Sequence, residues 1–513
     1  MGFENLIIHP KLIYRSIDEN TFFDKLNFAL KKAQRIKCRI WILGGSLIEL
    51  KSKNSHKIKE LLKKANVLAF LEKDLETFLE KGWEGCLELS LKRLKNSAVL
   101  VDSSENFPYK HLTLDEFLKK SKEDQKIEFI DLKSQQDRIR KHIEHNIFKT
   151  LYNCKFILGE EIDILEKSLA EFVGVKHCIT LSSGTDALLA ALMAYEVKKG
   201  DAVITTPFTF IATAETIALL GATPVFVDIE EETFNIDPAH LERAIETFVS
   251  KNKGYPLPKD YENLSLKGII AVNLFGHPAD YDRINKIAKK YDLFVIEDAA
   301  QSFGATYKGK KSCSLADIGC TSFFPAKPLG IYGDGGAVFL DDDELADKIR
   351  SIRVHGSSKE NRYEHIRVGI NGRFDTIQAG ILIEKLKIFH EELVLREKAA
   401  SYYTQNIIKK SDFITPPKVK KDVFSSWAQY SIVFRSSELK KMAIKSLEKN
   451  KIPYSIYYPV PLHLQPVFKY LGYKKGDFPV SESISERILS LPFYPYISKE
   501  EQDKVLKALL EYV

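Results

Sequence analysis

The chain has 513 residues, which is too long for one ordinary domain and predicts two to four domains. Apolar residues make up 44% and charged residues 28%, enough for large cores beneath a well-solvated surface. The formal net charge of +6 gives no reason to expect a nucleic-acid partner. The six cysteines have no zinc-site spacing and are too few for a disulfide framework, so we expect free thiols in the cytoplasm. No apolar run approaches 18 residues, so no membrane association is expected.

Residues 1–125 are predicted to form a small α/β domain of unknown role. Short apolar runs alternate there with Lys- and Glu-rich segments, a pattern typical of a small parallel sheet with helices. The runs lie at 5–9, 39–43, 67–71 and 98–101. The residues TLDE at 113–116 indicate a capping box. Gly44-Gly45-Ser46 follows a strand and could cradle a phosphate, but it lacks the GxGxxG spacing, so a simple turn is favoured.

A second α/β region, residues 126–385, is predicted to be a large domain with a mostly parallel sheet. Its strands read as continuous apolar runs, as expected when both faces of a sheet are covered: DAVITT, TPVFVDI, GIIAVNLFG and LFVIED. The polar, Pro- and Gly-marked segment 250–268 is interpreted as a surface insertion. From about Lys385 a long helix is expected to lead into a small C-terminal α/β domain, residues 386–513.

Two strand ends in this region carry polar residues that suit a ligand. Ser183-Gly184-Thr185 follows a strand and opens an apolar helix, where free backbone N–H groups make an anion site; a plain Ser/Thr cap is the alternative. Asp298 ends a buried strand, the position at which open α/β sheets bind ligands. A helix cap or a metal ligand are the alternatives for Asp298. Its neighbour Glu297 points to the opposite face, so no metal site is predicted.

Lys327 lies in an apolar setting, within TSFFPAKPLGIYGDGGA. A buried lysine has a lowered pKa and is a nucleophilic amine, whereas the commoner alternative is a lysine that extends to the surface. Ser322, five residues earlier, could reach the same anion as Thr185. Phe208 and Phe210 alternate after another strand, and one of them could stack on a planar ring while the other packs in the core.

Pyridoxal 5'-phosphate satisfies all of these features together. It needs a lysine for its aldehyde, an anion cradle for its phosphate and a carboxylate beside its pyridine nitrogen. The carboxylate keeps that nitrogen protonated, because an opposite charge favours the cationic form. An aromatic face would hold the ring flat.

Six motifs follow one another along residues 127–513, in the same order as in a known protein family: FILGEEIDILEKSLAEFVGVKHCITLSSGTDAL, PFTFIATAETIALLGATPVFVDI, EDAAQSFGA, SFFPAKPLGIYGDGGA, VGINGRFDTIQAGIL and YYPVPLHLQP. By these motifs the region resembles the DegT/DnrJ/StrS family of nucleotide-sugar aminotransferases, which have the type I aspartate-aminotransferase fold. The resemblance implies that Lys327 bonds to the cofactor aldehyde, that Asp298 pairs with the pyridine nitrogen and that Gln301 reaches the ring hydroxyl. It implies that the phosphate is held by Gly184, Thr185 and Ser322, and that Phe210 is the stacking aromatic.

The resemblance also implies a homodimer with a shared active site, since Asn371 matches a residue that reaches the phosphate of the neighbouring subunit. Arg373 matches a residue near the sugar nucleotide. Some members have histidine where Lys327 stands and act as dehydratases, so the lysine favours transamination.

The nearest subgroup aminates C-3 of a UDP-linked 3-oxo sugar, with L-glutamate as amine donor, for cell-surface polysaccharide such as lipopolysaccharide O-antigen. Four positions depart from that subgroup: Cys154 for a frequent glycine, Phe156 for a frequent tyrosine, Ala326 for a frequent serine, and Tyr457 for a frequent histidine, whereas Tyr458 matches. Lost hydroxyl and imidazole groups can change specificity strongly. Amination at C-4 or of a dTDP-linked sugar therefore stays open, as does a regulatory protein that carries pyridoxal phosphate.

Overall fold

The computed structural model describes residues 5–8, 39–43, 67–70 and 127–511. The chain divides into two compact units, Met1–Lys126 and Ile127–Val513. In the first unit, β1 (Asn5–Ile8), β2 (Arg39–Leu43) and β3 (Val67–Phe70) pair in parallel in the order β1-β2-β3, as predicted. The predicted strand at 98–101, the capping box at 113–116 and the turn at 44–46 lie outside the described residues.

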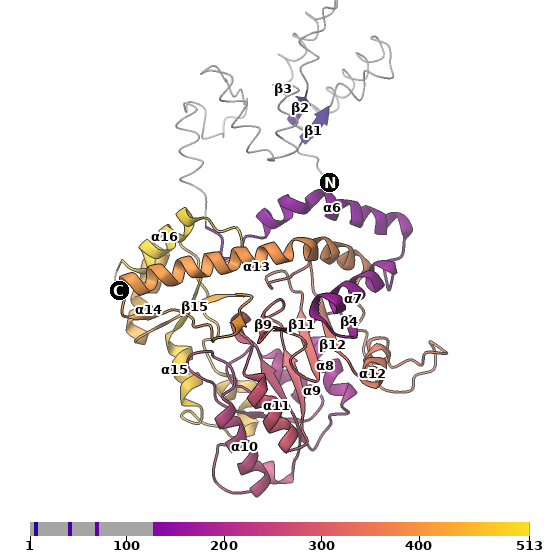
Figure 1. Ribbon diagram of the computed structural model, residues 1–513, viewed down its shortest axis with the longest axis vertical. Coiled ribbons are helices and arrows are strands. Elements are labelled where there is room, and N and C mark those ends of the chain that lie inside the picture. Colours follow the sequence, from indigo (N-terminus) through magenta and orange to yellow (C-terminus); the bar gives the residue numbers. More distant parts are fainter. Residues whose placement is uncertain (1–4, 9–38, 44–66, 71–126, 512–513) are drawn as a thin grey trace, which may run out of the picture. The chain divides into compact units, whose positions relative to one another are not determined.

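The second unit is built on a seven-stranded sheet (Figure 1). Its strand order is β4-β12-β11-β8-β7-β5-β6. The strands are β4 (His177–Leu181), β5 (Asp201–Thr205), β6 (Thr223–Phe226), β7 (Ser265–Val272), β8 (Phe294–Asp298), β11 (Ile318–Ser322) and β12 (Gly336–Leu340). The neighbours from β11 to β6 are parallel, and β12 is antiparallel to both β11 and β4. The sheet is therefore mostly parallel, as the sequence predicted.

Helices cover both faces of this sheet. One face packs against α8 (Gly184–Ala194), α9 (Ala212–Leu219) and α12 (Asp343–Arg353). The other packs against α7 (Glu160–Val173), α10 (Pro238–Ser250), α11 (Tyr281–Lys290) and α13 (Thr376–Lys410). Along β5, Val203 joins the first core whereas Ala202 and Ile204 join the second. Because successive side chains alternate between faces, a strand covered on both sides needs an unbroken apolar run.

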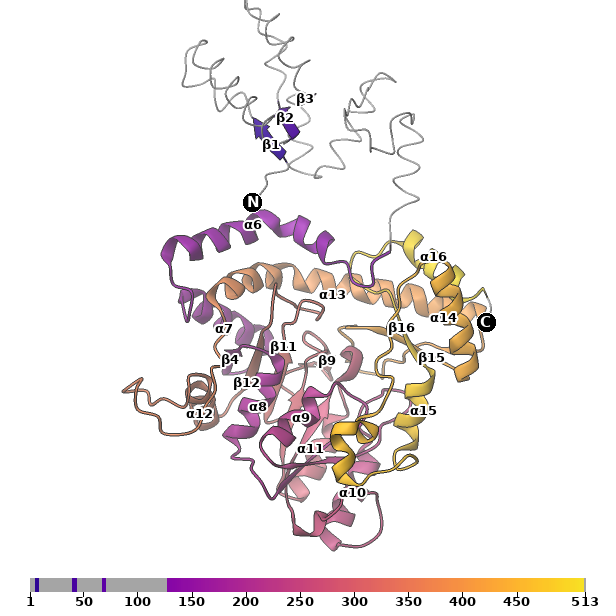
Figure 2. The ribbon, with the colours of Figure 1, turned by 180° about the vertical axis from the view of Figure 1, so that it is seen from behind.

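The helix α6 (Leu132–Asn153) lies along α13, as Figures 1 and 2 both show. The Gln135 side-chain amide donates to both carboxylate oxygens of Glu392 at 2.8–2.9 Å and links the two helices. The helix α13 begins at Thr376, about nine residues before the expected start at Lys385. The predicted boundary between residues 385 and 386 thus falls inside one continuous helix, and the division into large and small domains stays a prediction.

Beyond α13, a three-stranded antiparallel sheet contains β13 (Ile414–Thr415), β15 (Tyr430–Phe434) and β16 (Ile488–Leu491). The C-terminal part of α13 shares its core with α14 (Ser437–Lys449) and α16 (Lys499–Leu509), while α15 (Pro479–Arg487) precedes β16. A second small sheet joins β9 (Thr306–Tyr307), β10 (Lys310–Lys311) and β14 (Val423–Phe424). The described residues of this unit also contain four short 3-10 helices: η2 (Tyr261–Asn263), η3 (Leu274–Gly276), η4 (Leu462–Leu464) and η5 (Pro466–Leu471).

The segment 250–268 is more integrated than the predicted surface insertion. Its last residues belong to β7, which begins at Ser265. Tyr255 packs against the core beside α10, and its hydroxyl accepts a hydrogen bond from the Asp228 backbone N–H at 2.9 Å. Aromatic side chains within the segment supply this contact despite its polar composition. Among the described residues, no helix combines the length and hydrophobicity needed to cross a bilayer.

Candidate active site

Asp298 ends β8 at the carboxyl edge of the parallel sheet and is buried. The Thr213 hydroxyl donates to Asp298 Oδ2 at 2.8 Å, and the Ala300 backbone N–H donates to Oδ1 at 3.2 Å. Burial raises the pKa of the Asp298 carboxyl, while these two hydrogen bonds and the charge of Lys327 oppose that shift. The donors hold the carboxylate in one orientation at the strand end.

Glu297, the preceding residue, faces the other side of the sheet, as expected. It is fully buried and accepts hydrogen bonds from the Asn273 side-chain amide at 2.7 Å, the Ser312 hydroxyl at 2.6 Å and the Cys313 backbone N–H at 2.8 Å. Through these hydrogen bonds, Glu297 holds the loop before β11 in place. Asp298 and Glu297 therefore do not share a ligand site.

Lys327 lies in the turn after β11 and is half-buried. Its backbone N–H donates to the Phe324 carbonyl at 2.9 Å, and the Ile331 N–H closes the turn on the Phe323 carbonyl at 2.8 Å. Burial lowers the pKa of the Lys327 amine, and the negative charge of Asp298 acts in the opposite direction. The turn therefore presents an amine of increased nucleophilicity near a buried carboxylate.

The connection from β4 to α8 meets the end of β11. Ser183 is the N-cap of α8, and its hydroxyl accepts a hydrogen bond from the Asp186 N–H at 3.0 Å. Gly184 and Thr185 are the first helical residues, so their backbone N–H groups have no partner within the helix. A Cβ atom at Gly184 would lie 2.6 Å from the Cβ of Ser322. Glycine is needed here because β11 approaches so closely, and the approach places the α8 N-terminus, which begins with Gly184 and Thr185, beside Ser322.

An aromatic cluster forms a further wall. Phe208 is fully buried, whereas Phe210 is 54% exposed, with its ring centroid 6.4 Å from that of Tyr458. The Gln301 side chain accepts from the Phe275 backbone N–H at 2.8 Å and donates to the Tyr458 hydroxyl at 3.1 Å. Burial raises the pKa of the Tyr458 phenol, so it stays protonated at neutral pH. Of the two phenylalanines, Phe210 is the one available to a ligand.

Three more of the predicted residues are Tyr457, Ala326 and Phe156. Tyr457 adjoins Tyr458, with ring centroids 5.7 Å apart, and Ala326 precedes Lys327 in its turn. Phe156 is 43% exposed, and its carbonyl accepts from the Thr376 N–H at the start of α13. Among the described residues, no hydrogen bond joins Phe156 to Lys327 or Asp298.

Asn371 and Arg373 flank Gly372, whose carbonyl accepts the Ser182 N–H at 3.0 Å. This bond holds the segment beside the β4–α8 connection. The Asn371 side chain is exposed, and Arg373 Nε is buried with no hydrogen-bond partner among the described residues. Both residues therefore have capacity for further contacts.

Two residues of the site were missed in the sequence. Thr213 bonds to Asp298, and Thr209 Oγ1 lies 3.1 Å from Thr213 Oγ1. Both are buried. The available signal was a pair of hydroxyl side chains four residues apart in the otherwise apolar stretch PFTFIATA, since a buried hydroxyl needs a partner.

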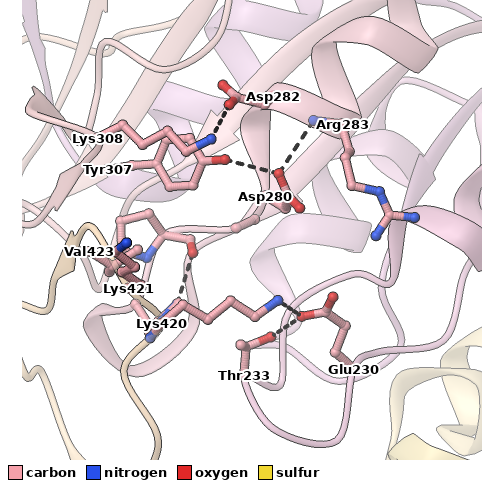
Figure 3. A pocket seen from close by; sticks show the side chains of 13 residues that line it. Glu230, Thr233, Asp280, Asp282, Arg283, Tyr307, Lys308, Lys420, Lys421 and Val423 are labelled. Carbon is pink, nitrogen blue, oxygen red and sulfur yellow. Dashed lines mark hydrogen bonds and ion pairs between the residues drawn. The ribbon is translucent and has the colours of Figure 1, made fainter.

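A separate cavity of about 360 Å³ shares no residue with this site (Figure 3). It lies between the start of α11, the β9 strand and the segment before β14. Lys420 pairs with Glu230 at 2.6 Å, and Lys308 pairs with Asp282, so these wall charges satisfy one another. None of the residues expected to contact pyridoxal phosphate lines this cavity, so it does not suit that cofactor.

The donors around Lys327, by contrast, fit that cofactor. A nucleophilic amine, a buried carboxylate, a helix N-terminus that requires glycine and an exposed aromatic ring match its aldehyde, pyridine nitrogen, phosphate and ring face. Residues 137–510 match the DegT/DnrJ/EryC1/StrS aminotransferase family. The chain belongs to this family.

Comparisons with single proteins agree with the family assignment. The chain is 48% identical over 371 residues to the UDP-2-acetamido-2-deoxy-3-oxo-D-glucuronate aminotransferase of Pseudomonas aeruginosa, covering 72% of this chain and 96% of that protein. It resembles the crystal structure of a DegT/DnrJ/EryC1/StrS aminotransferase from Brucella abortus, with a TM-score of 0.70 and 42% identity over 75% of this chain and 99% of that one.

A third relative is NtdA from Bacillus subtilis with bound cofactor PMP, with a TM-score of 0.66 and 27% identity. This match covers 89% of the present chain and 97% of that one. The predictions of an aminotransferase-type α/β fold and of pyridoxal phosphate as cofactor are confirmed for this family. The protein is an aminotransferase, and the alternative of a regulatory protein is not supported.

Proposed function

We propose that this aminotransferase transfers an amino group from L-glutamate to C-3 of a UDP-linked 3-oxo sugar. The observation that carries the proposal is the 48% identity, across 96% of its length, to an enzyme named for a UDP-linked 3-oxo glucuronate. The product would serve the synthesis of a cell-surface polysaccharide such as an O-antigen.

The geometry around Lys327 supports the residue roles that we propose. Lys327 would bond to the cofactor aldehyde, and Asp298 would hold the charge of the pyridine nitrogen. Gln301, oriented by the Phe275 N–H, would contact the ring hydroxyl, and Phe210 would cover the ring face. The cradle of Gly184, Thr185 and Ser322 would accept the phosphate.

When bound, pyridoxal phosphate supplies an electron sink that makes the α-proton of the amine donor removable. Once the amine of glutamate has displaced the Lys327 amine from the aldehyde, the freed Lys327 is the base that we propose for this proton. Because burial lowers its pKa, a larger fraction of the amine is neutral at pH 7 than for an exposed lysine. Lys327 would take the proton at the α-carbon of glutamate and deliver one at C-3 of the sugar in the second half of the reaction.

We further propose a homodimer whose subunits complete one another's sites through Asn371, with Arg373 near the sugar nucleotide. Large apolar side chains are exposed at the end of α6 and in the segment after α12, including Tyr152 at 90% and Val368 at 83%. Both ribbon views show the segment after α12 projecting from the body of its unit (Figures 1 and 2). Apolar surface of this kind marks protein–protein contacts, and a second copy of the chain is the proposed occupant.

The sugar contacts are proposed to involve Phe156, Ala326, Tyr457 and Tyr458. The first three differ from the residues expected in the C-3 subgroup, so the carbon that is aminated and the nucleotide carrier must be measured. The four cysteines among the described residues of the second unit are free, and three of them are buried. Such thiols suit a reducing compartment, and we propose that the enzyme acts in the cytoplasm.

The experiment is a product assay. Purified enzyme would be incubated with L-glutamate and a panel of UDP- and dTDP-linked 3-oxo and 4-oxo sugars, with products identified by mass spectrometry. The proposal expects the 3-amino UDP sugar as the best product. A product aminated preferentially at C-4, or formed preferentially from the dTDP sugars, would contradict the proposed substrate.

A further inference from the structure

The carboxylate of Asp298 accepts a hydrogen bond from a hydroxyl group on a different element, the helix α9. Thr213 is the second residue of α9, and its side chain is fully buried. Its hydroxyl donates to Asp298 Oδ2 at 2.8 Å. The Ala300 N–H on Oδ1 is longer, at 3.2 Å, so Thr213 supplies the shorter of the two hydrogen bonds.

The direction of the next hydrogen bond follows from counting protons. A hydroxyl has one proton, and Thr213 uses it on an acceptor-only carboxylate. Thr209 Oγ1, 3.1 Å away, must therefore donate to Thr213. Thr209 is 3% exposed, so both hydroxyls are shielded from bulk water. The result is a directed pair of bonds from Thr209 through Thr213 to Asp298.

We propose that Thr213, supported by Thr209, is a positioning residue that holds Asp298 ionised and correctly oriented toward the pyridine nitrogen of the cofactor. The inference rests on the proposed role of Asp298. A buried carboxylate without donors favours its neutral form, and a neutral carboxyl cannot hold a pyridinium charge. Thr213 therefore acts on the chemistry through Asp298.

The position of Thr209 links the hydrogen bond to Thr213 with the aromatic side chain proposed to cover the cofactor ring. Thr209 lies between the buried Phe208 and the exposed Phe210. The same turn of chain thus presents the proposed stacking ring and the donor to Thr213. One local structure sets both the face of the cofactor ring and the charge at its nitrogen.

The test uses three substitutions on α9. Thr213→Val removes the hydroxyl at nearly constant volume, and Thr213→Ser retains it. Thr216→Val is the matched control, because Thr216 is also fully buried but its hydroxyl donates to the Ala212 carbonyl of its own helix at 3.0 Å. Loss of a hydrogen bond to a charged group corresponds to a decrease in kcat of roughly 10- to 100-fold for Thr213→Val. Thr213→Ser and Thr216→Val should stay within about threefold of wild type.

The deciding readout is the protonation of the pyridine nitrogen, measured by ¹⁵N NMR on the holoenzyme with ¹⁵N-labelled cofactor. The wild type, Thr213→Ser and Thr216→Val should show a protonated nitrogen, whereas Thr213→Val should show a shift toward the unprotonated form. Thr209→Val should move the signal in the same direction by a smaller amount, and it replaces Thr213→Val if that variant fails to fold.

Asp298→Asn separates failure of the inference from failure of the site assignment. If this variant leaves the nitrogen protonated, Asp298 does not have its proposed role and the inference falls with it. If Asp298→Asn removes the proton but neither threonine variant changes the signal, the site assignment stands and the positioning role of Thr213 is overturned. An equal change in Thr216→Val would assign the effect to helix packing and would also overturn the proposal.

Discussion

Substitution of Gly184 by alanine tests the proposed phosphate cradle where its atoms lie closest together. The new Cβ would lie 2.6 Å from Ser322 Cβ and 3.1 Å from Ser322 Cα. Carbon atoms make favourable contacts at about 3.5–4.0 Å, so β11 and the start of α8 must separate by about 1 Å. Hydrogen bonds tolerate donor–acceptor distances of about 2.7–3.2 Å, so such a shift would break contacts of the cradle with a phosphate.

Overpacking of this size costs about 1–3 kcal/mol. If that cost appears in cofactor binding, the Kd for pyridoxal phosphate rises about 5- to 150-fold. The assay is titration of the apoenzyme with the cofactor, followed by absorbance, with thermal unfolding of the apoenzyme measured in parallel.

The control is Gly254→Ala, whose Cβ would lie 2.6 Å from Thr247 Oγ1, outside the proposed site. It should leave the cofactor Kd unchanged. In the double variant Gly184→Ala/Ser322→Gly, the Cβ contact is removed, so the added effect of Gly184→Ala should be smaller than in wild type. An unchanged Kd in Gly184→Ala, or full additivity in the double variant, would refute the reasoning.

Four further predictions concern the site, the assembly, the first unit and acid stability. Lys327→Ala should abolish turnover and the visible absorbance of the holoenzyme; measurable transamination in this variant would contradict its role. If the sites are shared, a mixture of Lys327→Ala with Asn371→Ala, which is itself of low activity, should regain turnover in hybrid dimers. An active monomer in sedimentation would exclude this assembly. Enzyme starting at Lys126 should fold, bind cofactor and transaminate with unchanged kinetic constants, and a KM for the sugar nucleotide raised more than about tenfold would show that residues 1–125 assist binding. Burial lowers the pKa of His277 from 6.5 to about 4, so the unfolded chain binds a proton at a higher pH than the folded chain. The free energy of unfolding should therefore fall by up to about 3 kcal/mol as pH decreases from 6.5 to 4. Denaturation measured across this pH range should show a smaller loss in His277→Gln.

The elements and several side-chain environments could be predicted from short stretches of sequence. Continuous apolar runs predicted the buried strands, and the structure places Asp298 at a strand end and Ser183 at a helix N-cap, as expected. The choice between Phe208 and Phe210 was open in the sequence, because alternation alone does not say which face is covered. The fold decides it by burying Phe208 beneath Phe234 and Tyr458.

The sequence by itself determined the family and its cofactor, and it predicted the residue types of the proposed site, because each depends on local order: a lysine in an apolar turn, an acid at a strand end, a glycine opening a helix. Only the tertiary structure decided which groups meet. Thr213 bonds to Asp298 across 85 residues, and Gln301 bonds to Tyr458 across 157. The close approach of Gly184 to Ser322 likewise depends on how β4 and β11 flank β12. Such contacts follow from strand order and packing, and no spacing along the chain encodes them.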